Sequence, residues 1–162
     1  MSSSDHHLSV VQGSEVPDAS PFSFAIVWSE WNSEVTGAMR DGAMKTLLRY
    51  GALKESISVK AVPGSFELTL GAQWMLEKKE VDAVICIGCV IQGETRHFDF
   101  ICEAVAKGIT DLNIEYSTPV IFGVLTPNDQ QQAMDRAGGK HGNKGDEAAI
   151  AAIKMAALYA SL

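Results

Sequence analysis

The sequence predicts an α/β protein built on a doubly wound parallel sheet. Its 162 residues, 46% hydrophobic and 20% charged, suit one compact domain of ordinary composition. Short apolar runs alternate along the chain with longer segments of helical period. Each strand that is followed by a helix and a parallel strand requires a right-handed crossover, so this alternation places helices on both faces of the sheet.

The first strand is expected at residues 24–28, which are almost entirely apolar. A helix is then expected over residues 33–50. Asn32 is a candidate N-cap for this helix, and Gly51 is a candidate stop at its C-terminus.

Residues 57–61 alternate apolar and polar side chains as a strand does, until the pair Pro63–Gly64 interrupts them. The apolar positions of residues 66–79 then follow a helical period. Residues 83–91 contain no charged or hydrogen-bonding side chain other than cysteine, and they predict a strand buried on both faces that ends before Gly93.

The second half of the chain continues the pattern. A third helix is expected at residues 96–112 and a fourth buried strand at 119–125. Thr126–Pro127 is typical of a helix start, and that helix is expected to end at the glycines 138–139. After a polar loop, the alanine-rich residues 146–159 predict a last helix.

Residues 1–20 are predicted to be a flexible polar tail and residues 21–162 a single domain. The tail lacks the basic start and apolar centre of a secretory signal, and no apolar run approaches the roughly 20 residues that cross a bilayer. Thirteen basic against twenty acidic residues give a net charge of −7, with no basic stripe for nucleic acid. Three cysteines suit a reducing compartment, so we expect a cytoplasmic protein that binds neither membrane nor nucleic acid.

Ligands of such sheets bind beyond the carboxyl ends of the strands, so the loops after each strand are the candidate site. After the first strand, Trp31 either stacks on a planar heterocycle or only anchors the surface. After the second, Ser65, Phe66 and Glu67 begin a helix. Glu67 is either an acceptor for a polyol or an acidic residue that favours the helix dipole.

The loop after the third strand is the most informative one, because a helix start offers free backbone N–H groups to an anion. Thr95 adds a hydroxyl there, whereas Glu94 would repel a phosphate unless its side chain turns outward. His97 lies in the first helical turn. A histidine at this edge is a candidate for proton transfer, the alternative being a structural role.

Two apparent motifs do not indicate a site. Cys86 and Cys89 have C-x-x-C spacing, but residues three apart on a strand point to opposite faces, so we expect two core cysteines and no metal. The glycine-rich residues 138–145 lack the order of a phosphate-binding loop and follow a helix instead of a strand.

Four segments together resemble 6,7-dimethyl-8-ribityllumazine synthase, an enzyme of riboflavin biosynthesis. They are VPGSFE at residues 62–67, GCVIQGETRHFD at 88–99, PVIFG at 119–123, and RAG at 136–138 followed by GNKG at 142–145. The resemblance covers about residues 24–158. It implies a flavodoxin-like three-layer α/β/α sandwich with a four-stranded parallel sheet.

The resemblance also implies a reaction. Members of the family are expected to condense 5-amino-6-(D-ribitylamino)uracil with 3,4-dihydroxy-2-butanone 4-phosphate, without a cofactor. By position, His97 would transfer protons and Trp31 would stack on the pyrimidine. The remaining substrate contacts would come from Ser65, Phe66, Glu67, Cys89, Val90, Ile91, Glu94, Thr95, Phe122, Arg136 and Lys144. The family often has Arg-Phe-Asn at residues 30–32, where this chain has Glu-Trp-Asn, and a small residue at position 94.

Arg136 predicts an oligomer. If the fourth helix starts at Pro127, Arg136 lies about nine residues, or roughly 13 Å, from the end of its own strand. It would then serve the site of a neighbouring copy, in agreement with the pentamers of the family, which pair or close into shells. Two alternatives stay open: a related riboflavin synthase that consumes the lumazine, and a ligand-binding shell protein without catalytic activity.

Overall fold

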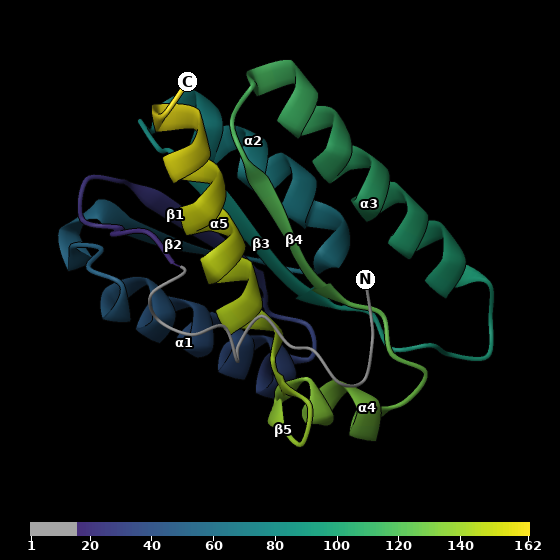
Figure 1. Cartoon of the computed structure of the whole chain (residues 1–162). Coiled ribbons are helices and arrows are strands. Elements are labelled where there is room, and N and C mark those ends of the chain that lie inside the picture. The colour runs from purple at the N-terminus through teal and green to yellow at the C-terminus, as the bar shows by residue number, and fades with distance from the viewer. Residues whose placement is uncertain (1–15) are drawn as a thin grey trace.

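The computed structural model describes residues 16–162, which form one parallel sheet covered by helices (Figure 1). The strands are β1 (Phe24–Ser29), β2 (Ile57–Val62), β3 (Ala83–Cys89) and β4 (Val120–Leu125). All three neighbouring pairs are parallel, in the order β2-β1-β3-β4. This is the flavodoxin-like order, in which the chain changes direction across the sheet between β1 and β3. The predicted fold class is confirmed.

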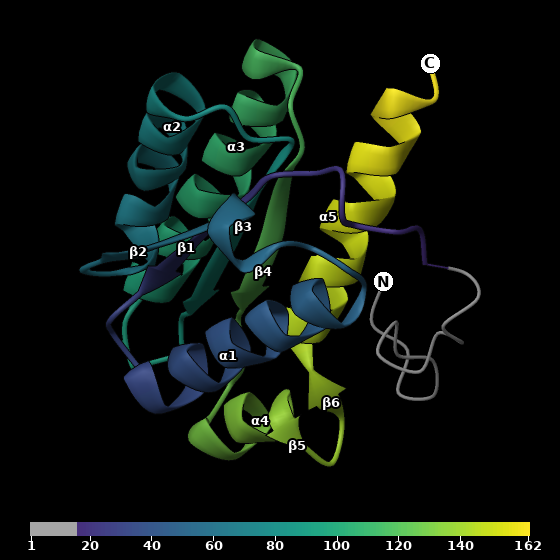
Figure 2. The same cartoon turned by 90° about the vertical axis from the view of Figure 1, so that its left-hand side faces the viewer.

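The helices form two layers, one on each face of the sheet (Figure 2). Helices α2 (Leu68–Lys78) and α3 (His97–Tyr116) cover one face, and α1 (Ser33–Arg49) and α5 (Lys144–Ala160) cover the other. All seven side chains of β3 are buried, because this central strand is packed on both faces. No helix in residues 16–162 is long and apolar enough to span a bilayer.

Cys86 and Cys89 confirm the alternation expected on β3. Cys86 belongs to the apolar cluster beneath α2 and α3, whereas Cys89 belongs to the cluster beneath α1 and α5. Burial raises the pKa of Cys86 to about 12 and, with a smaller contribution from Cys102, that of Cys89 to about 11. Both are therefore protonated thiols at neutral pH, and within residues 16–162 they form no disulfide or metal cluster.

Several predicted boundaries were wrong. The fourth helix, α4 (Gln130–Asp135), begins after Asp129, whose carboxylate accepts a hydrogen bond from Gln132 N (2.8 Å). The backbone at Pro127 is used elsewhere, since its carbonyl accepts from Gln92 N (3.0 Å). Helix α3 extends four residues beyond the predicted end at 112.

The glycine-rich segment after α4 is a short hairpin. Strand β5 (Ala137–Gly139) pairs antiparallel with β6 (Gly142–Asn143), where a polar loop was expected. Asn143 then caps α5, because its side-chain oxygen accepts from Gly145 N at 2.8 Å. This cap starts the last helix two residues earlier than predicted.

Of the predicted tail, residues 1–15 lie outside the described residues. Residues 16–20 pack against the domain: Ala19 is fully buried, and its N–H donates to Tyr50 O at 2.8 Å. The packed part of the chain thus begins before the expected boundary at residue 21.

Candidate active site

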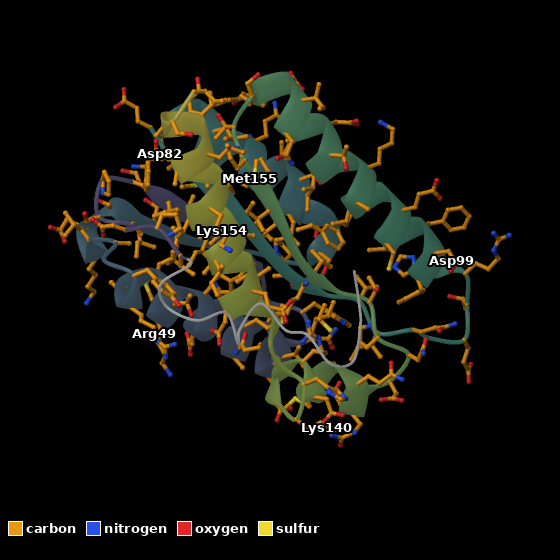
Figure 3. The ribbon with its side chains drawn as sticks, in the orientation of Figure 1. Arg49, Asp82, Asp99, Lys140, Lys154 and Met155 are labelled. Atoms are coloured by element: carbon orange, nitrogen blue, oxygen red, sulfur yellow. The ribbon has the colours of Figure 1, made fainter. Side chains whose placement is uncertain are left out.

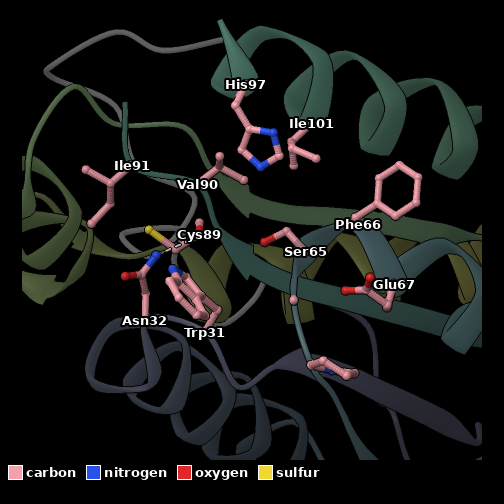
Figure 4. A pocket seen from close by; sticks show the side chains of 12 residues that line it. Trp31, Asn32, Ser65, Phe66, Glu67, Cys89, Val90, Ile91, His97 and Ile101 are labelled. Carbon is pink, nitrogen blue, oxygen red and sulfur yellow. Dashed lines mark hydrogen bonds between the residues drawn. The ribbon is translucent and has the colours of Figure 1, made fainter. Parts of the chain in front are cut away.

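A pocket of about 630 Å³ opens at the carboxyl ends of β1, β2 and β3 (Figure 4). It brings together eight residues that were predicted from the sequence: Trp31, Ser65, Phe66, Glu67, Cys89, Val90, Ile91 and His97. Its volume is typical of small-molecule sites, and it lies at the sheet edge where such folds bind ligands.

Trp31 offers a large aromatic surface to this pocket. Its side chain is 73% exposed, although it follows a buried strand. The backbone holds it: Glu30 N donates to Val62 O (2.8 Å) and Trp31 N to Pro63 O (3.1 Å), which extends the pairing of β1 with β2 beyond both strands. An exposed indole fixed in this way is available for stacking on a flat ring.

His97 begins α3 and lines the same pocket (Figure 4). Its backbone N–H lies 3.4 Å from Thr95 Oγ1. Ile101, one turn later on the same helix, also faces the pocket. Sequence reasoning missed Ile101, although its position four residues after His97 places both on one helix face.

Ser65 and its neighbours form the wall next to β3. Residues Ser65–Glu67 form a 3₁₀ turn that leads directly into α2. Ser65 Oγ is shielded from solvent, has no hydrogen-bond partner in the described chain, and lies 2.7 Å from the position that a Cβ on Gly88 would take. The absence of a side chain at Gly88 therefore lets this wall pack closely on β3.

Glu94 and Thr95 do not line the pocket. Both are exposed in the loop that leads from β3 to His97. The expectation that the Glu94 side chain turns outward from a bound phosphate stays a prediction. Phe122 is also outside the pocket; it lies on β4, the edge strand, and is 38% exposed.

Arg136 and Lys144 lie together in a different part of the molecule. Arg136 Nη2 is 2.9 Å from Glu147 Oε1, and Lys144 Nζ is 3.1 Å from Glu147 Oε2. Arg136 also donates to the carbonyl of His141 in the hairpin. In Figure 3, Lys140 marks this hairpin and Asp99 marks the first turn of α3, at different places on the molecule. The predicted distance of about 13 Å along a helix from the strand end to Arg136 was wrong, because α4 begins at Gln130 and has only six residues. Arg136 nevertheless does not line the pocket of its own chain.

Glu147 organises this pair of cations and was missed by the sequence analysis. Burial raises the pKa of Glu147, but hydrogen bonds and charges from Lys144 and Arg136 outweigh it and lower the pKa below its ordinary value of 4.5. The carboxylate is therefore charged at neutral pH. The spacing of Lys144 and Glu147 (i, i+3) on α5 was a usable signal.

Glu147→Gln is expected to destabilise the protein by about 1.5–3 kcal/mol at pH 7, since it removes the charge from two charge-assisted hydrogen bonds. A lowered folded-state pKa stabilises above the ordinary value, and this contribution is lost as pH falls through the folded-state pKa. The difference between variant and wild type should thus shrink progressively as pH falls below 4.5. Thermal unfolding at several pH values measures this stability difference, with the exposed Glu55→Gln as control. A difference that does not change with pH would contradict the lowered pKa of Glu147.

The family model for 6,7-dimethyl-8-ribityllumazine synthase matches residues 21–160 of the chain. The chain belongs to this family. Curated relatives agree: the lumazine synthase of Cytophaga hutchinsonii is 60% identical over 157 residues, covering 97% of this chain and 98% of the relative. That of Parabacteroides distasonis is 52% identical over 155 residues, covering 96% and 97%. The resemblance seen in the sequence is therefore confirmed, and with it the expectation of an enzyme of riboflavin biosynthesis with lumazine synthase activity.

Proposed function

We propose that the pocket beside Trp31 and His97 condenses 5-amino-6-(D-ribitylamino)uracil with 3,4-dihydroxy-2-butanone 4-phosphate to 6,7-dimethyl-8-ribityllumazine. The observation that carries this proposal is the convergence of an exposed indole, a polar turn and an imidazole in one pocket of a lumazine synthase chain. The pyrimidine stacks on Trp31. Residues 65–67 and 89–91 hold the heterocycle and the ribityl chain.

The reaction is a problem of positioning and proton transfer. An amine nitrogen of the pyrimidine bonds to the ketone carbon, and the first water leaves. Phosphate is then eliminated, the second nitrogen bonds to the neighbouring carbonyl carbon, and a second water leaves as the ring closes. Holding two reactants in place supplies as much as about 7–11 kcal/mol of barrier lowering in favourable cases. His97 stands at the pocket wall, where its imidazole can take a proton from the attacking amine or give one to the departing oxygen.

The phosphate group requires residues that one chain does not bring to its own pocket. The loop at Glu94 and Thr95 offers backbone N–H groups near the start of α3. Arg136, Lys144 and Phe122 are absent from the pocket lining of the described chain. We propose that a neighbouring copy supplies them, so that the site is complete only in a homo-oligomer built from pentamers.

Exposed apolar side chains on α2 and on the 3₁₀ turn before it support this assembly. Phe66, Leu70 and Trp74 are spaced four residues apart and are 57%, 48% and 52% exposed. They extend the apolar rim of the pocket along the outer face of the helix. An apolar stripe next to a binding site is typical of a protein interface. A single domain over residues 21–162, against which residues 16–20 pack, is also proposed here and would be the repeating unit.

His97→Ala is expected to lower kcat about 10²- to 10⁴-fold without abolishing turnover, because positioning by the rest of the pocket remains. Lumazine fluorescence and phosphate release from both substrates measure the rate, with native mass as a control for assembly. A correctly assembled variant with no rate above the uncatalysed reaction would contradict the dominance of positioning. Wild-type protein that forms no lumazine would overturn the proposed function itself.

A further inference from the structure

Asn32 has an unusual backbone and an unusual side-chain contact at the pocket wall. Its φ of 59° and ψ of 44° lie in the left-handed region. Within residues 16–162, Ser117 is the only other non-glycine residue with a positive φ. Asparagine tolerates this conformation better than most residues. Its side chain makes no cap hydrogen bond to α1, although Asn32 occupies the N-cap position. The cap position predicted from the sequence is thus correct, but the side chain serves another purpose.

The side chain reaches across the sheet edge to β3. Asn32 Nδ2 donates to the carbonyl of Cys89, the last residue of β3, at 3.0 Å (Figure 4). The register between β1 and β3 ends at Trp28 and Ile87, so the side-chain amide continues the pairing beyond the backbone ladder. Cys89 itself begins the segment 89–91 that lines the pocket.

Trp31 is therefore tied to strand ends on both sides. Its own N–H is bonded to Pro63 O on the β2 side, and the next residue, Asn32, is bonded to Cys89 O on the β3 side. Because the indole is 73% exposed, packing alone does little to fix its direction. The two hydrogen bonds hold the backbone from which the ring projects.

We propose that Asn32 is a positioning residue that sets the indole of Trp31 against residues 89–91, and thereby the affinity for the flat pyrimidine substrate. This inference rests on the proposed function, whose substrate binds between these two surfaces. In this role Asn32 affects the substrate indirectly: its hydrogen bond to Cys89 holds the backbone that carries Trp31. Loss of the Asn32 amide donor should weaken binding of the pyrimidine substrate. Binding of the phosphate substrate, 3,4-dihydroxy-2-butanone 4-phosphate, should be unaffected.

The test compares two changes of Asn32 with a matched change elsewhere. Asn32→Asp keeps the side-chain shape but places an acceptor against the Cys89 carbonyl, and Asn32→Gly keeps positive φ without strain and removes the side chain. Asn113→Asp is the control: Asn113 Nδ2 donates to Val120 O at 2.9 Å, outside this pocket. It loses the same kind of amide donor without touching the Trp31 loop.

Both Asn32 variants should raise the KM for the pyrimidine about five- to tenfold, as expected for one lost hydrogen bond. The KM for the phosphate substrate should stay within about twofold, and Asn113→Asp should change neither value. An unchanged pyrimidine KM, or an equal rise in both KM values, would overturn the inference. Failure of wild-type protein to turn over would instead overturn the proposed function.

A ligand-free readout separates positioning from direct substrate contact. With Trp28 and Trp74 replaced by Phe, Trp31 is the one remaining tryptophan, because the chain has three. Time-resolved anisotropy of Trp31 should decay faster after Asn32→Gly and should be unchanged by Asn113→Asp. An identical decay in Asn32→Gly and its Trp31-only parent would contradict the positioning role, whatever the kinetics.

Discussion

Mixing the His97→Ala and Arg136→Ala variants should restore activity. Subunits carrying His97→Ala keep Arg136, and subunits carrying Arg136→Ala keep His97. If each site takes the pocket from one copy and Arg136 from the next, random 1:1 mixed oligomers contain both residues in about one quarter of their sites, half of one half. Activity should therefore rise to about a quarter of the wild-type value.

The physical basis is the location of the two residues in the described chain. His97 lines the pocket, whereas Arg136 is held by Glu147 and the hairpin carbonyl of His141. On the proposed arrangement, each variant alone lacks one component in every site, and Arg136→Ala would lose the proposed charge-assisted contact to phosphate. The experiment dissociates both proteins, mixes and reassembles them, and measures lumazine formation. Each protein dissociated and reassembled alone is the control, and a mixture no more active than the mean of the two would contradict a shared site.

Gly145→Ala should lower the free energy of unfolding more than any other substitution considered for this protein. A Cβ at Gly145 would lie 1.8 Å from the carbonyl oxygen of Met39 in α1. Met39 is fully buried and the contact is with backbone, so a side-chain rotation cannot relieve it. Helix α5 must move away from α1. We expect a loss of about 3 kcal/mol or more, which exceeds the gain of about 1 kcal/mol in helix propensity from Gly to Ala.

The matched control is Gly37→Ala in α1. Among residues 16–162, no atom outside the adjoining backbone of α1 lies within 4 Å of a Cβ at Gly37, so the same substitution should stabilise by about 0.5–1 kcal/mol through helix propensity. Chemical unfolding of both variants measures the contrast. Equal stability of the two would contradict the close approach of α1 and α5.

The pocket was largely predictable from the sequence because a parallel sheet gathers its loops at one edge. Once the strands at 24–28 and 83–91 were recognised, the positions of Trp31 and His97 followed from strand direction alone. Short apolar runs define these strands locally, and Gly93 follows the second of them. No long-range information was needed to bring the two residues into one pocket.

The pairing of Arg136 and Lys144 with Glu147 was not predictable in the same way. Thr126–Pro127 is a good local helix start, but a tertiary hydrogen bond from Gln92 to Pro127 O uses that backbone, and α4 begins later. The hairpin after it depends on pairing between Gly139 and Gly142, two glycines without apolar periodicity. The contact of Asn32 with Cys89 spans 57 residues and likewise has no local signal.

We propose that one pocket, completed by an adjoining copy, holds a flat ring on an indole and an anion near an imidazole. The most direct test is an experimental structure of the assembled protein with a pyrimidine substrate analogue and phosphate bound. We expect the pyrimidine to stack on Trp31, and the phosphate to lie near Thr95 and within hydrogen-bond distance of the guanidinium of a neighbour's Arg136. A ring bound away from Trp31, or Arg136 remote from every phosphate, would contradict it.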